Sequence, residues 1–116
     1  MAESKNFKAD ELTCSCCGKS GVQQWALDKL QAIRDEYNKP MTITSSYRCS
    51  DHPVERVKTK AGTHNQGIAF DVAVSSGAQR YELVSLAIKH GANGIGVDRN
   101  FIHFDFRNTT RVVWVY

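Results

Sequence analysis

The sequence predicts an α+β domain in which two main helices pack on a small, mostly antiparallel sheet of about four strands. Two stretches repeat apolar residues at three- and four-residue steps, as amphipathic helices do, and others alternate apolar with polar residues, as half-buried strands do. Helices grouped against such a sheet define the α+β class. The chain has 116 residues, enough for one hydrophobic core, so we expect a single domain over residues 1–116.

Both expected helices have clear end signals. Apolar side chains follow helical spacing over residues 22–37, and Asn38 and Pro40 then end the helix. The second helix covers residues 78–90, and Gly91 follows it where a left-handed cap belongs. Each helix therefore has an apolar face that can pack on the sheet.

Four stretches rich in β-branched or aromatic residues are expected to be strands: residues 41–47, 67–74, 101–107 and 112–116. The dipeptide Asn93-Gly94 predicts a turn. Residues 48–65 are polar and aperiodic, and a loop of this length in a small domain usually carries function.

Three polar side chains stand out among apolar neighbours. Asp71 lies between two alanines on one face of its strand, and His103 lies within an aromatic strand. His64 precedes Asp71 by seven residues, with Gly67 between them to let the backbone turn. Two imidazoles and one carboxylate are the ligand set of a catalytic zinc that keeps one position open for water. Such a zinc suits amide hydrolysis, because it polarises a carbonyl and lowers the pKa of its water to about 7.

Three blocks of sequence resemble, in order, the signature blocks of a known enzyme family: Ser45 to Arg48, Thr63 to Asp71, and Phe101 to Asp105. This is the zinc D-alanyl-D-alanine carboxypeptidase and L-alanyl-D-glutamate peptidase family, and the chain is most similar to its small phage and prophage members. The family hydrolyses peptide bonds in the stem peptides of peptidoglycan. Its fold is similar to the amino-terminal signalling domain of hedgehog proteins.

The resemblance implies a Zn²⁺ cofactor, with His64, Asp71 and His103 as its ligands. It also implies that Arg48 pairs with a carboxylate or carbonyl of the substrate, for which a guanidinium is well shaped. Ser46 is a second candidate for substrate binding, and the alternative is that it supports the loop. The expected activity is hydrolysis of peptidoglycan stem peptides, as a D-Ala-D-Ala carboxypeptidase or an L-Ala-D-Glu type endopeptidase of the kind found in phage endolysins.

The general base is less well defined. The family usually has an acid three residues before the third zinc ligand, and Asn100 occupies that position here. We favour Asp98, five residues before His103, as the base, and assign Asp105 to support of a zinc ligand; the reverse assignment is the alternative. If neither acid acts, the chain is a non-catalytic, zinc-stabilised binding or phage virion assembly protein.

Four cysteines remain to be explained: Cys14, Cys16, Cys17 and Cys49. We expect thiols rather than disulfides, because the sequence starts without an export signal. Closely spaced thiolates can share a soft metal, but the sequence has no second complete cysteine pair. Thiols without a metal are therefore the favoured interpretation. A structural zinc, or a metal-sensing or redox module, is the alternative.

Composition excludes other classes of function. The net charge is +3, and no run of Lys or Arg concentrates it, so we expect no nucleic-acid partner. No apolar stretch approaches the roughly 20 residues of a membrane-spanning helix. We expect a monomer made in the cytoplasm without a signal peptide. It would reach peptidoglycan peptides, its expected partner, after release from the cell or as part of a phage particle.

Overall fold

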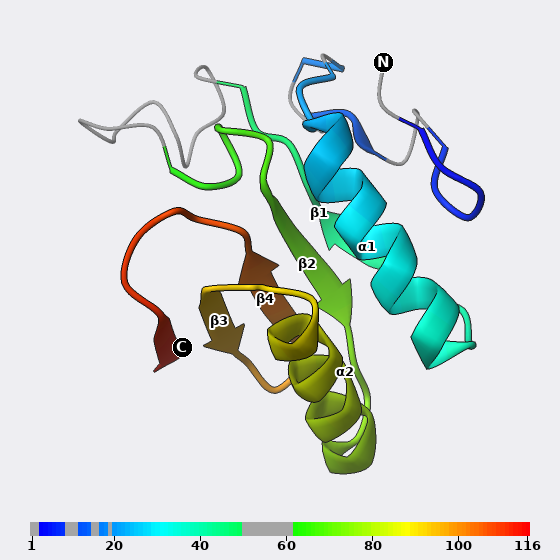
Figure 1. Ribbon diagram of the computed structural model, residues 1–116, viewed down its shortest axis with the longest axis vertical. Coiled ribbons are helices and arrows are strands. Elements are labelled where there is room, and N and C mark those ends of the chain that lie inside the picture. The colour runs from blue at the N-terminus through cyan, green and yellow to red at the C-terminus, as the bar shows by residue number, and fades with distance from the viewer. Residues whose placement is uncertain (1–2, 9–11, 15–16, 19, 50–61) are drawn as a thin grey trace.

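The computed structural model describes residues 3–8, 12–14, 17–18, 20–49 and 62–116 (Figure 1). Its elements follow the chain in this order: α1 (Gln24–Tyr37), β1 (Ile43–Ser45), β2 (Ala69–Ala73), α2 (Gly77–Lys89), β3 (Gly94–Val97), β4 (Phe101–Asp105) and β5 (Val112–Val115). Cys16 and most of the loop expected to carry function, residues 50–61, lie outside the described residues. None of the helices in the described part is long and apolar enough to span a bilayer.

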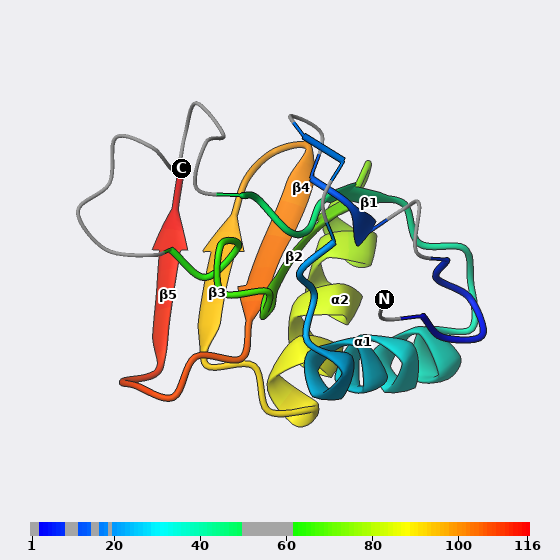
Figure 2. The same cartoon turned by 90° about the horizontal axis from the view of Figure 1, so that it is seen from above.

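The strands form one sheet in the order β1-β2-β4-β3-β5 (Figure 2). Three of the pairings are antiparallel, and β5 pairs with β3 in parallel. The predicted α+β class and mostly antiparallel sheet are therefore confirmed. The sheet has one strand more than the four expected.

The additional strand is β3, where the sequence predicts a turn at Asn93-Gly94, and that prediction is wrong. The glycines of β3 are needed for packing and not for a turn. A Cβ on Gly94 would lie 2.5 Å from the carboxylate of Asp105, and one on Gly96 would lie 2.7 Å from the ring of Trp114. These residues are cross-strand partners, because Gly94 pairs with Asp105 in β4 and Gly96 pairs with Trp114 in β5. The glycines of β3 make room for large side chains on the neighbouring strands.

The helix ends agree with the predicted signals. Asn38 adopts a left-handed conformation with φ of 56°, and its N–H donates to the carbonyl of Arg34. At the start of α2, the hydroxyl of Ser76 accepts the N–H of Gln79, which satisfies one of the unpaired donors of a helix terminus. Gly91 has φ of 95° just after the end of α2. Both helices therefore stop where the chain can turn back to the sheet.

The sheet has one apolar and one polar face. Phe70 and Val72 of β2, with Ile102 and Phe104 of β4, belong to a buried core that includes apolar residues of both helices. The helices also contact each other. Because side chains alternate along a strand, the residues between these four point to the opposite face. That face carries the polar residues singled out in the sequence.

Candidate metal centre

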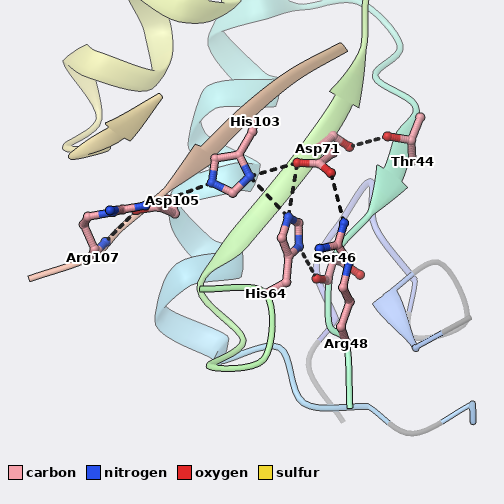
Figure 3. Close-up of polar contacts among 8 residues, drawn as sticks. All are labelled: Thr44, Ser46, Arg48, His64, Asp71, His103, Asp105 and Arg107. Carbon is pink, nitrogen blue, oxygen red and sulfur yellow. Dashed lines mark hydrogen bonds and ion pairs between the residues drawn. The ribbon is translucent and has the colours of Figure 1, made fainter. Parts of the chain in front are cut away.

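Strand pairing and one turn bring His64, Asp71 and His103 together (Figure 3). Asp71 in β2 and His103 in β4 are direct cross-strand partners, so their side chains leave the same face of the sheet. His64 lies in the turn before β2. In this turn Gly67 has φ of 76°, and its carbonyl accepts the N–H of Gln23 just before α1. A Cβ on Gly67 would meet the backbone of Gly21 at 1.9 Å, so only glycine allows this close approach.

Three donor atoms converge in this arrangement. His64 Nε2 lies 3.2 Å from both Asp71 Oδ1 and His103 Nδ1, and His103 Nδ1 lies 3.0 Å from Asp71 Oδ1. Ligand atoms bound to one tetrahedral zinc at 2.0–2.2 Å are about 3.3 Å apart. All three residues are buried. The spacing of the donor atoms therefore fits a single zinc ion.

The remaining ring nitrogens show which atoms face the centre. His64 Nδ1 hydrogen-bonds the carbonyl of Ser46, and His103 Nε2 lies 2.7 Å from Asp105 Oδ2. Each of these acceptors needs an N–H donor, which leaves lone pairs on His64 Nε2 and His103 Nδ1 when the rings are neutral. Two lone pairs and a carboxylate facing one another repel unless a cation lies between them. The donor set and its orientation therefore fit Zn²⁺.

The ionisation of Asp71 and His103 follows from the same contacts. Burial alone would raise the pKa of Asp71, but hydrogen bonds from His103 and His64, which both rings can donate when protonated, outweigh burial and lower the pKa to about 2. Burial would lower the pKa of His103, yet its bonds to Asp105 and Asp71 raise that pKa above the ordinary value. The pocket thus favours positive charge at its centre, which a proton or a metal ion can supply.

Asp105 is held between His103 and Arg107. Its side chain is fully buried, and Arg107 donates from Nε to Oδ1 at 2.7 Å and from Nη2 to Oδ2 at 2.8 Å. Burial opposes ionisation, but Arg107 and His103 keep the pKa of Asp105 far below its usual range. The structure therefore places this permanently charged carboxylate behind the imidazole of His103.

Asp98 lies in the turn between β3 and β4. Its Oδ2 accepts the N–H of Asn100 at 2.9 Å, and its backbone carbonyl accepts a bond from Arg80 Nε at 3.3 Å. Neither Asp98 nor Asp105 is among the described residues that line the cleft. Neither candidate base is thus in direct contact with that space.

Arg48 lies at the edge of the three-residue cluster. Its Nη2 is 3.7 Å from Asp71 Oδ2, its N–H donates to the carbonyl of His64, and its carbonyl accepts a bond from Asn65. Ser46 is buried, and its contact with His64 is made by the backbone carbonyl. Within the described part of the chain, the hydroxyl of Ser46 has no hydrogen-bond partner. The segment Ser46 to Arg48 therefore supports His64 by its backbone and presents a guanidinium to the cleft.

A cleft of about 950 Å³ opens beside these residues. The three donor residues and Arg48 form part of its wall, together with Phe101, Arg107, Trp114 and Tyr116. The ring centroid of Trp114 lies 5.1 Å from that of His103, and the Arg107 guanidinium lies 5.3 Å from the centroid of Trp114.

The sequence predicts no role for Trp114 or Tyr116, because their place depends on the parallel pairing of β5 with β3. Alternation along residues 101–107 does place Arg107 on the face of His103. The contact between Arg107 and Asp105 is seen only in the structure.

This fold, with a possible metal site on the polar face of its sheet, is consistent with a family of metal-dependent peptidases. Residues 5–105 match the family model described as Peptidase M15, and the chain belongs to this family of zinc D-Ala-D-Ala carboxypeptidase-like proteins. Comparison with curated proteins gives no match. The resemblance seen in the three sequence blocks is thereby confirmed.

Proposed function

We propose that this protein is a zinc metallopeptidase that hydrolyses peptide bonds in peptidoglycan stem peptides. The observation that carries the proposal is the convergence of His64 Nε2, Asp71 Oδ1 and His103 Nδ1 beside an open cleft, in a chain of the Peptidase M15 family. These three residues would hold the metal. A bound Zn²⁺ supplies Lewis acidity, which polarises a peptide carbonyl and makes water acidic enough to react near neutral pH.

The surrounding residues hold the ligands in place. The Ser46 carbonyl and the Asp105 carboxylate each bond the outer nitrogen of one imidazole, so each ring keeps its tautomer and direction. Arg107 in turn fixes Asp105 through two parallel bonds. We therefore assign Ser46 and Asp105 to positioning of the ligands.

Substrate contacts are assigned to the cleft walls. Stem peptides carry free carboxylates, and Arg48, which lines the cleft, is our candidate to pair with one of them. Trp114 and Tyr116 supply apolar surface for the peptide. Burial raises the pKa of Tyr116 and outweighs the lowering effect of its contact with Trp114, so its hydroxyl stays protonated as a hydrogen-bond donor.

Asp98 remains our candidate for the general base. Both oxygens of Asp105 are occupied by Arg107 and His103, whereas Asp98 is half-buried in the turn between β3 and β4. A base often approaches its water only when substrate is bound, so the position of Asp98 outside the cleft wall is compatible with this role.

A second candidate function has one observation in its favour. The carboxylate of Asp71 is a proposed ligand, and no other described carboxylate lines the cleft. A domain of this kind can hold zinc for stability alone and serve as a binding or phage virion assembly protein. For either function we propose a monomer with peptidoglycan peptides as partner, acting after release from the cell or within a phage particle.

Hydrolysis of stem peptides by zinc-loaded protein, followed by mass spectrometry, tests the proposal. The wild type is compared with His64→Ala, Asp98→Asn and the control Asp28→Asn, which changes an exposed carboxylate on α1. We expect cleavage by the wild type and the control and none by the other two variants. Loss in His64→Ala alone would exclude Asp98 as the base. A zinc-bound wild type that cleaves nothing would favour the binding protein.

A further inference from the structure

A second group of metal-binding side chains lies outside the candidate metal centre. The Sγ atoms of Cys14, Cys17 and Cys49 all lie within 4.8 Å of one another. Cys14 and Cys49 are buried, and Cys17 is exposed. Cys14 and Cys49 are 35 residues apart in the sequence, yet their Sγ atoms are 3.6 Å apart. The fold therefore gathers thiols from two distant segments.

Backbone contacts of the described residues hold Cys14 and Cys17 close together. An antiparallel bridge between Thr13 and Ser20 closes the turn that carries them at the base. Gly18 follows Cys17 with φ of 71°, and its N–H donates to the carbonyl of Cys14 at 2.8 Å. Two cysteines separated by two residues are a common half of a structural zinc site. The Sγ atoms of Cys14 and Cys17 both lie within 4.8 Å of that of Cys49.

The distance between the Sγ atoms of Cys14 and Cys49 fits metal coordination. Thiolates bound to one tetrahedral zinc at about 2.3 Å are about 3.8 Å apart. The 3.6 Å between Cys14 and Cys49 is close to this value, and the N–H of Cys49 donates to Cys14 Sγ at 3.3 Å, a bond that stabilises a thiolate. A disulfide would use only two of the three thiols.

We propose that Cys14, Cys17 and Cys49 form a second, structural metal site that binds zinc through thiolates. This departs from the favoured interpretation of the sequence, in which these thiols hold no metal. Cys16 lies outside the described residues, and the proposal does not depend on it. The inference is independent of peptidase activity, because it concerns metal binding alone.

The site has a structural consequence for the cleft. Cys49 directly follows Arg48, and the segment from Ser46 to Arg48 bonds His64 at two backbone positions. A metal at the thiols would tie this segment to the residues that precede α1. It would thus hold Arg48 and His64 in register with the sheet.

Metal content of the purified full chain, loaded with zinc under reducing conditions, tests the proposal. We expect two zinc ions per chain in the wild type and one each in Cys17→Ser and His64→Ala. Cys17 is exposed, so serine there leaves the core packing intact. Ser20→Ala, an exposed change at the base of the same turn, is the matched control and should keep both ions.

Cobalt provides a second readout, which identifies the kind of ligand that binds the metal. Cobalt bound by thiolates absorbs intensely in the near ultraviolet, whereas cobalt bound by imidazole and carboxylate does not. We expect this absorption in the wild type and in His64→Ala, and its loss in Cys17→Ser. Absence of the band in the wild type, unchanged zinc content in Cys17→Ser, or a Cys14–Cys49 disulfide in the mass spectrum of the zinc-loaded protein would each overturn the proposal.

Discussion

At the scale of single residues, Asp105 determines the orientation and charge of the groups around it. Its carboxylate has no access to solvent, and it binds Arg107 on one side and His103 on the other. The charge therefore acts on His103, a proposed metal ligand, through one hydrogen bond, since it makes the imidazole a stronger donor of electrons to a metal. We therefore expect Asp105 to act as a positioning residue, whose replacement changes metal affinity before it changes the chemistry.

Asp105→Asn tests that role with little change in shape. The amide removes the negative charge that orients His103, so we expect the zinc affinity to fall about 10- to 100-fold. Competition with a chelator measures the affinity, and Asp28→Asn is the control. An unchanged affinity would contradict the positioning role.

The stability of the metal-free protein should depend on pH through the same residues. Burial opposes the charge of Asp71 and Asp105, but their hydrogen bonds lower both pKa values in the folded state below the ordinary 3.8. Both carboxylates therefore stabilise the fold above pH 3.8, and this contribution is lost as the pH falls through their pKa values in the folded state. His103 has a raised pKa despite burial. Protonated His103 therefore stabilises the fold below its ordinary pKa of 6.5, and this contribution is lost as the pH rises through its pKa in the folded state.

Without metal, we therefore expect the highest Tm between the ordinary values of 3.8 and 6.5. Zinc needs a neutral His103, so the zinc-loaded protein should have its maximum at higher pH. Thermal unfolding across pH, with zinc or with a chelator, measures both curves. Coincident maxima would refute the pairing of these charges in the metal-free state.

At the scale of the elements, β3 makes the polar face possible. Gly94 and Gly96 have no side chains where Asp105 and Trp114 need space. Replacement of Gly96 by alanine forces the Trp114 ring away from its position beside His103. The absence of side chains on these two glycines therefore leaves space for the side chains of Asp105 and Trp114 on the polar face.

Gly96→Ala should destabilise the protein by about 1–3 kcal/mol, the usual cost of overpacking. Urea unfolding measures this free energy. Gly77→Ala is the control, because its Cβ would meet nothing closer than 3.9 Å in the first turn of α2. A Gly96→Ala variant as stable as this control would show that Trp114 moves aside freely.

For the whole molecule, the candidate metal centre joins segments that are distant in the chain. His64 belongs to a turn tied to the residues before α1, while Asp71 and His103 belong to adjacent strands of the sheet. A metal bound to all three stabilises the folded state alone, because the unfolded chain does not gather these ligands.

Zinc should therefore raise the free energy of unfolding, by about 4 kcal/mol when free zinc exceeds its dissociation constant 1,000-fold. Calorimetry with added zinc and with a chelator measures the shift. In a Cys17→Ser background, which removes the proposed cysteine site, the shift should become much smaller when His103→Ala is added. An equal shift in the double variant would place the stabilising metal outside both proposed sites.

The sequence by itself determined the two helices, four of the five strands and the face on which Asp71, His103 and Asp105 lie. These features depend on the local periodicity of apolar and polar residues, which can be read directly from the sequence. Only the tertiary structure decided that β3 is a strand, that β5 brings Trp114 and Tyr116 to the cleft, and that Cys49 meets Cys14. Each of these depends on contacts between distant segments, because a side chain's spacing along the chain does not say which strand or turn will lie beside it.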